Sequence, residues 1–145
     1  SDWLILRGRW SVGCTRKVFH FCGAIVPSIC LVLLATLPRS TYLSLGLSIT
    51  ATASFGFNSG GYAVNHLDIG GAIAPLLIGI SNTIATVSGI IAPILTTTLL
   101  NDQPESPERW EIVFYVSAGI ISLGMLIFVV FGKGTPQFEQ FCNPK

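Results

Sequence analysis

The chain has 145 residues, of which 50% are apolar and 10% charged, and its formal net charge at pH 7 is +1. In a soluble domain about a quarter of all residues are charged. This chain therefore has too few charged residues to cover a water-facing surface. It also has no basic patch interleaved with aromatic residues, which excludes nucleic acid as a partner. The composition predicts a protein embedded in lipid.

Four apolar stretches are long enough to cross a membrane, because a bilayer core roughly 30 Å thick needs about 20 helical residues. They run from about 18 to 37, 42 to 64, 73 to 100 and 112 to 131. Lipid offers no water to an open backbone, so each stretch must be helical, even where it contains Pro27 or Pro93. The predicted fold is all-α, a polytopic membrane bundle of four transmembrane helices.

The Lys and Arg residues predict which way the chain ends face. Before the first stretch and after the last stand Arg7, Arg9, Arg16, Lys17, Lys133 and Lys145. The two loops on the opposite side hold only Arg39 and Arg109, and the second loop adds Asp102, Glu105, Glu108 and Glu111. Cytoplasmic loops carry the excess of positive charge. We therefore expect a multi-pass protein with both ends in the cytoplasm.

The second stretch has a polar face, provided that its helix continues through Gly60 and Gly61. Along that face lie Thr50, Ser54, Asn58, Gly61, Asn65 and Asp68. The interiors of the first and fourth stretches hold little that is polar beyond Ser28, Ser117 and Ser122. We expect those two helices at the periphery of the bundle.

The third stretch also has a polar face at 100° per residue. One arc holds Gly79, Asn82, Thr83, Thr86, Pro93 and Thr97. A strip of small residues and a strip of bulky ones fill the rest. We expect the bulky strip to meet lipid, the small strip to pack on another helix and the polar strip to face a cavity.

Five residues are predicted to line a substrate pathway: Ser54, Asn58, Asn82, Thr83 and Thr86. Helix packing alone is the alternative for each Ser and Thr, since small hydroxylated residues are ordinary at such contacts. The two Asn residues differ, because a buried amide needs a hydrogen-bonding partner or water.

One charged cluster, Asn65-His66-Leu67-Asp68, lies close to a span. An aspartate at mid-bilayer costs about 3 kcal/mol, so Asp68 is placed at the cytoplasmic end of the second helix. Two interpretations are open: a polar cap before the third helix, or a proton-sensitive cytoplasmic gate of His66 and Asp68, since histidine can change charge near neutral pH. His20, at the start of the first stretch, is interpreted as an interfacial residue.

The four cysteines, Cys14, Cys22, Cys30 and Cys142, form no C-x-x-C pair and neighbour no histidine cluster. We expect neither a disulfide framework nor a zinc site. Paired carboxylates, a nucleophile elbow and a phosphate loop are also missing from the sequence, so we predict that the chain is no enzyme and has no cofactor. It begins at Ser1 without an initiator Met or a signal segment, and we expect it to be part of a longer protein.

Residues 57–69 resemble the F-S-x-S-G-F-x-V-N-H-L-D-I stretch of the anion:cation symporters of the major facilitator superfamily. The similarity continues at 79–83 and 89–94 and resumes at 109–115 and 131–134, while 2–8 and 16–27 resemble the preceding loop and helix. Two features depart from the family pattern. Asn58-Ser59-Gly60 replaces S-x-S, and Gly70-Gly71 replaces Ala-Pro, which suggests a looser turn into the third helix.

This resemblance implies that residues 1–145 form the C-terminal part of a twelve-helix transporter, its helices nine to twelve. The whole protein would move small inorganic or organic anions, such as phosphate or carboxylates, by coupling to sodium ions or protons. The matching residues are shared by members of plasma, lysosomal and vesicle membranes. One third of such a fold would not transport alone, because alternating access needs two opposing halves, so its partners would be lipid and the remaining helices. The alternative is a free-standing tetraspan scaffold or interaction protein.

Overall fold

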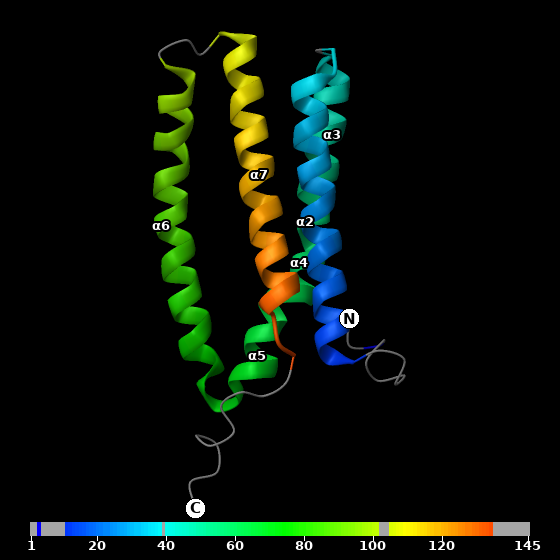
Figure 1. Cartoon of the computed structure of the whole chain (residues 1–145), viewed down its shortest axis with the longest axis vertical. Helices are drawn as coiled ribbons and strands as arrows, with labels where there is room; N and C mark the ends of the chain where they lie inside the picture. Colours follow the sequence, from blue (N-terminus) through cyan, green and yellow to red (C-terminus); the bar gives the residue numbers. More distant parts are fainter. Residues whose placement is uncertain (1–2, 4–10, 39, 102–104, 135–145) are drawn as a thin grey trace, which may run out of the picture.

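The computed structural model describes residues 3, 11–38, 40–101 and 105–134, with only the backbone at Ser59. Every regular element in these ranges is a helix (Figure 1), which confirms the all-α class for the part of the chain described. Several residues that contributed to the predictions lie outside the described ranges: Arg7, Arg9, Arg39, Asp102, Cys142 and Lys145.

The first predicted stretch lies in helix α2, Val12–Thr36. Ser11 caps it, because the Ser11 hydroxyl accepts a hydrogen bond from the Cys14 N–H at 3.3 Å. The helix therefore begins before the apolar residues do and includes Arg16 in its first turns. Pro27 lies inside the helix and is completely buried.

The second predicted stretch is broken into short elements. They are α3 (Thr41–Ser54), α4 (Gly56–Asn58), the π-helical turn η1 (Ser59–Ala63) and α5 (Val64–Gly70). Gly61 has φ −98° and ψ −108°, which is not helical. The polar face predicted for a continuous helix is therefore wrong beyond this point, because the kink redirects the residues that follow.

After α5 the chain reverses through one turn of 3-10 helix, η2 (Gly71–Ile73), into α6 (Ala74–Leu100). Gly71 has φ 50° and ψ −121°, a conformation that residues with a Cβ rarely adopt. The turn is therefore short. The last helix, α7 (Pro107–Phe131), starts with Pro107, where a missing N–H costs nothing.

Helix α2 is the centre of the bundle, with α7 and α3 packed on it, while α6 stands apart and contacts mainly α5 (Figure 1). Gly23, Ala24 and Ser28 on α2 are buried, and the Ser122 hydroxyl of α7 donates to Ser28 Oγ at 3.3 Å. The first and fourth stretches, expected at the periphery, instead form the most extensive helix pair. Small side chains on α2 make this approach possible.

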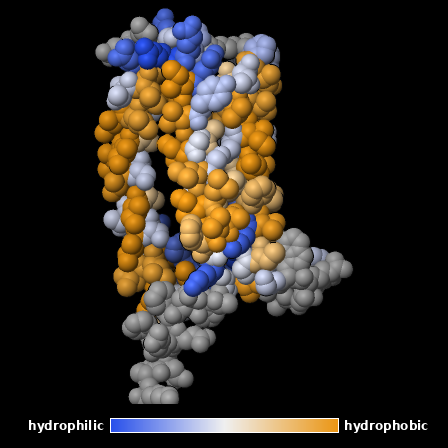
Figure 2. Space-filling view, viewed as in Figure 1, coloured by the Kyte–Doolittle hydropathy of each residue, from blue (hydrophilic) through white to orange (hydrophobic). Residues whose placement is uncertain are grey.

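Three segments are long and apolar enough to cross a membrane: Val12–Thr36, Thr41–Leu100 and Pro107–Phe131. The middle one contains the reversal at η2, with α3 and α6 lying on different sides of α7 (Figure 1). Figure 2 shows apolar side chains over the middle of this face and hydrophilic residues gathered at its ends. The count of four spans requires two in the middle segment and stays a prediction.

Candidate functional site

Several polar residues of the described chain meet where α2 touches the kink at η1. Two glycines allow this close approach. A Cβ on Gly61 would lie 2.7 Å from the backbone nitrogen of His20, and one on Gly23 would lie 2.7 Å from Asn58 Oδ1. Because real Cβ atoms do not come so close to other atoms, only glycine fits at these two places without a shift.

Asn58 finds two partners on α2. Its Oδ1 lies 2.9 Å from His20 Nδ1, and its Nδ2 donates to the Gly23 carbonyl oxygen at 3.5 Å. Since Pro27 has no N–H, the Gly23 carbonyl has lost its usual helical donor four residues on, and the Asn58 amide serves in its place. The Asn58 side-chain amide was expected to need a hydrogen-bonding partner, and α2 supplies it.

His20 is half-buried rather than simply interfacial. Its ring lies 4.5 Å from the Phe128 ring of α7 and edge-on to Tyr62 at 5.7 Å, both measured between ring centroids. The carbonyl end of the Asn58 amide can only accept, so we assign the proton to His20 Nδ1. His20 thus joins α2, α4, η1 and α7.

Below the kink, Arg16 and Asp68 form an ion pair between α2 and α5. Arg16 Nε donates to Asp68 Oδ2 at 2.6 Å and Nη2 to Oδ1 at 3.3 Å. Arg16 Nη1 also donates to the Gly60 carbonyl oxygen at 3.2 Å. The Arg16 and Asp68 side chains are 4% and 20% exposed. A buried guanidinium needs such partners, so the pair anchors the end of α5 to the beginning of α2.

His66, also on α5, turns to the other side and contacts α6. Its Nδ1 lies 3.1 Å from the Tyr62 carbonyl oxygen, and its Nε2 lies 2.8 Å from Ser81 Oγ. A carbonyl only accepts, so Nδ1 carries the proton, and in the neutral ring Nε2 accepts from the Ser81 hydroxyl. His66 and Asp68 therefore share a helix but serve different contacts.

A cavity of about 400 Å³ lies between the kink and α6. Its polar lining comes from Tyr62, His66, Ser81 and Asn82. Of the five predicted pathway residues, only Asn82 lines this cavity. The Thr83 and Thr86 hydroxyls donate to their own helix, at the Gly79 and Asn82 carbonyls.

Ser54 and Asn58 lie elsewhere. Ser54 is 7% exposed and donates to the Thr50 carbonyl oxygen at 2.8 Å, and Asn58 faces α2. The structure thus separates the predicted pathway residues into a cavity residue, two hydroxyls on the exposed face of α6, and two residues on the kinked segment.

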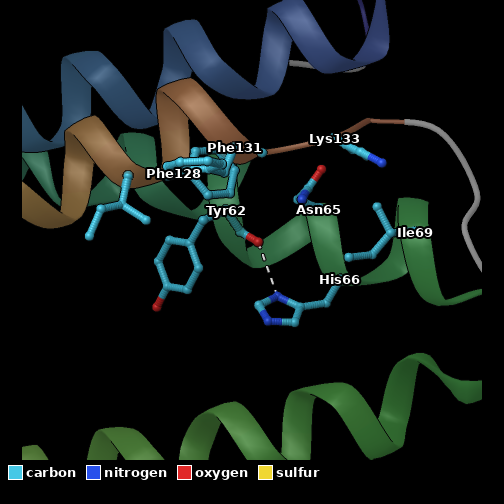
Figure 3. A pocket seen from close by; sticks show the side chains of 9 residues that line it. Tyr62, Asn65, His66, Ile69, Phe128, Phe131 and Lys133 are labelled. Atoms are coloured by element: carbon cyan, nitrogen blue, oxygen red, sulfur yellow. Dashed lines mark hydrogen bonds between the residues drawn. The ribbon is translucent and has the colours of Figure 1, made fainter.

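A second, larger cavity of about 610 Å³ lies between α5 and the end of α7. Figure 3 shows Tyr62, Asn65, His66 and Ile69 on one side of it and Phe128, Phe131 and Lys133 on the other. Among the residues that the structure describes, no three His, Cys, Asp or Glu side chains gather as a metal site would require.

Sequence reasoning missed Arg16 and His20 as members of the site. Arg16 was used only as a positive charge for orientation. A usable signal was present, because Arg16, His20, Gly23 and Pro27 follow the i, i+4, i+7, i+11 spacing of one helical face. That face is polar or small throughout and meets the kink.

No protein-family profile matches this sequence, but individual proteins do. The chain is 34% identical to human sialin over 134 residues, 91% of this chain and 27% of sialin. It is 32% identical to a putative inorganic phosphate cotransporter of Drosophila ananassae over 143 residues, 95% of this chain and 29% of that protein. It is 29% identical to bovine vesicular glutamate transporter 2 over 137 residues, 94% of this chain and 23% of that protein. The chain thus spans less than a third of the length of these relatives.

Proposed function

This chain belongs to the anion:cation symporter family, and we propose that it forms the last four helices, nine to twelve, of a secondary active transporter of the major facilitator fold. Two of the three relatives, the phosphate cotransporter and vesicular glutamate transporter 2, are transporters by name, and the chain is a membrane protein rather than an enzyme. The proposed cargo is a small anion, phosphate or an organic carboxylate, coupled to sodium ions or protons. The chain would need the remaining helices of the longer protein to transport.

The cavity between η1 and α6 carries this proposal. Its wall combines the Asn82 amide, the His66–Ser81 hydrogen bond and Tyr62 with apolar side chains, among them Ile78, Ile84 and Ala85. A few polar groups on an apolar wall are typical of small-molecule sites. We propose that Asn82 contacts the anion directly, with Thr83, Thr86, Ser54 and Asn58 belonging to the same pathway in the whole transporter.

We propose that His66 and Asp68 act at a cytoplasmic gate, with Arg16 as a third member. The Arg16–Asp68 pair links α2 to α5, and the His66–Ser81 bond links α5 to α6. Helix α5 thus holds two polar contacts, one to each neighbour. Gating would consist of breaking one contact while the other stays, as the two halves of the transporter rock about the substrate.

Uptake measurements test the pathway assignment. Vesicles containing the full-length protein are supplied with labelled phosphate, glutamate or sialic acid. Asn82→Leu should lower uptake of the transported anion about tenfold, because it removes one hydrogen bond to a charged group. Thr98→Val is the matched control: its hydroxyl bonds only to the Ile94 carbonyl of its own helix. Unchanged uptake by Asn82→Leu at normal expression would show that Asn82 does not line the pathway.

A further inference from the structure

The cavity between η1 and α6 has few side chains with a hydrogen left for a ligand. His66 Nδ1 donates to the Tyr62 carbonyl oxygen, and the Ser81 hydroxyl donates to His66 Nε2. Among the residues that the structure describes, no Lys or Arg lines this cavity. An anion held at this wall needs hydrogen-bond donors, and the lining side chains that still offer one are Asn82 and Tyr62.

The Tyr62 hydroxyl forms no hydrogen bond with the described part of the chain. The Tyr62 side chain is 44% exposed and lines the cavity. Figure 3 shows its hydroxyl pointing away from α7 and toward α6, as the His66 ring also does. A tyrosine hydroxyl that becomes buried usually has a hydrogen-bond partner. Once the remaining helices of the transporter cover this wall, the hydroxyl therefore needs an acceptor.

Two histidine rings position the Tyr62 ring. Its centroid lies 5.7 Å from that of His20 on α2 and 6.0 Å from that of His66 on α5, with interplanar angles of 73° and 72°. Edge-to-face contacts of this kind stabilise aromatic pairs. Because the ring is held by these contacts, a ligand of the hydroxyl has little side-chain freedom left to restrict.

These ring contacts do not explain why residue 62 is a tyrosine. Tyr62 stands where the family pattern F-S-x-S-G-F-x-V-N-H-L-D-I has its second Phe. Phenylalanine has the same ring and could make the same edge-to-face contacts with His20 and His66. The hydroxyl is therefore an addition of this chain to the pattern, and it lies in the wall that also holds Asn82.

We propose that Tyr62 binds the transported anion, its hydroxyl donating to an anion oxygen as a second donor beside the Asn82 amide. A hydrogen bond to a charged acceptor is about twice as strong as one between neutral groups, so a single hydroxyl changes the affinity measurably. This role rests on the proposed pathway, since it requires the anion to pass through this cavity. A variant with Phe at this position should bind the same anion more weakly.

The concentration dependence of uptake tests this role. Vesicles containing the full-length protein are supplied with whichever of labelled phosphate, glutamate or sialic acid the unmodified protein takes up. Tyr62→Phe should raise KM about tenfold, the loss of one hydrogen bond to a charged group. Vmax should stay the same, because the lost contact is one of binding. Tyr115→Phe is the matched control: Tyr115 is 47% exposed but lines no part of this cavity, and its KM should equal that of the unmodified protein.

The outcomes separate the role of Tyr62 from the pathway itself. An unchanged KM in Tyr62→Phe, with uptake reduced in Asn82→Leu, would overturn the role of Tyr62 and leave the pathway in place, since the acceptor of the hydroxyl would then belong to the protein. Normal uptake in both variants would overturn the pathway as well. A lower Vmax at the same KM, or an equal rise of KM in Tyr115→Phe, would also contradict direct binding by Tyr62.

Discussion

Arg16 shows what a single charge does at the end of a membrane helix. It is buried, and three of its bonds reach two other parts of the chain: two to Asp68 on α5 and one to the Gly60 carbonyl. The Gly60 carbonyl is available because the helix is irregular there. The same side chain therefore neutralises Asp68 and completes the hydrogen bonding of the kink.

Removing either partner of this pair should destabilise the bundle unequally. Asp68→Ala removes the carboxylate from a guanidinium that is 4% exposed, whereas Arg16→Gln removes the guanidinium from a carboxylate that is 20% exposed and closer to water. We expect Asp68→Ala to lower the free energy of unfolding by about 3 kcal/mol and Arg16→Gln by less. Loss of helicity by circular dichroism during a titration with denaturing detergent measures both.

Lys17→Gln provides the control for this pair, because it removes a positive charge from the next position of the same helix without touching Asp68. It should leave the unfolding midpoint nearly unchanged. Equal destabilisation by Lys17→Gln and Arg16→Gln would mean that positive charge at the beginning of α2, and not the ion pair itself, stabilises the bundle.

Individual residues were predictable from the sequence only in part. Asn58 was expected to need a partner, and it has two on α2. Which helix supplies them could not be predicted, because His20 and Gly23 precede it by more than thirty residues and come close only through the kink. The role of Arg16 was not predicted for the same reason, because its partner Asp68 is also far away in the sequence.

At the scale of elements, the kink at η1 decides which residues meet. In a straight helix Asn58, Asn65 and Asp68 would share a face. With the kink, Asn58 faces α2, Asp68 pairs with Arg16, and Asn65 lines the cavity beside α7. Irregular backbone inside a membrane helix is tolerated where other groups cover it, and here Arg16 and the backbone of α2 do so.

Gly61→Ala tests whether close packing of the kink on α2 holds the segment in place. Its Cβ would lie within 3.0 Å of three His20 atoms, including two of the backbone. Because backbone cannot rotate away, we expect a loss of about 1–3 kcal/mol in the free energy of unfolding. Gly46→Ala is the control, since a Cβ there meets nothing within 4 Å. It should be neutral or slightly stabilising, and the same detergent titration compares the two. Equal stability of both variants would argue against close packing at the kink.

The length of the apolar stretches predicted the long helices well and the kink poorly. The third predicted stretch, 73–100, differs from α6 by one residue, because length and hydropathy alone determine a regular helix in lipid. The break at Gly61 depends on contact with α2, which hydropathy does not describe. Two adjacent glycines, Gly60 and Gly61, were the only local sign.

At the scale of the whole molecule, burial is concentrated on α2, whereas on α6 only the two end residues, Ala74 and Leu100, are buried. Much of α6 is exposed, on its bulky side at Ile80 and Ile84 and on its polar side at Asn82, Thr83 and Thr86. Lipid would suit the bulky side but not the polar side. A helix with one face of each kind fits the proposal that further helices of a longer protein cover the polar face.

The arrangement of charges makes a prediction about how often the chain crosses the membrane. The beginning of α2, with Arg16 and Lys17, lies at the same end of the bundle as the end of α7, which precedes Lys133 (Figure 1). Glu105 and Glu108 lie near the start of α7, at the opposite end. Four spans would put positions 14 and 133 on one side of a membrane and position 108 on the other, whereas three spans would put positions 14 and 133 on opposite sides.

Single-cysteine labelling decides between these counts. Cys14 is exposed and serves as the first site once Cys22, Cys30 and Cys142 are replaced by alanine. Lys133→Cys and Glu108→Cys, each with Cys14→Ala added, provide the other two. A membrane-impermeant maleimide applied to sealed vesicles should label positions 14 and 133 from the cytoplasmic side only, since positive charge is retained there, and position 108 from the other side. Labelling of positions 14 and 133 from opposite sides would mean that the 41–100 segment crosses only once, and the proposed correspondence to four transporter helices would then fail.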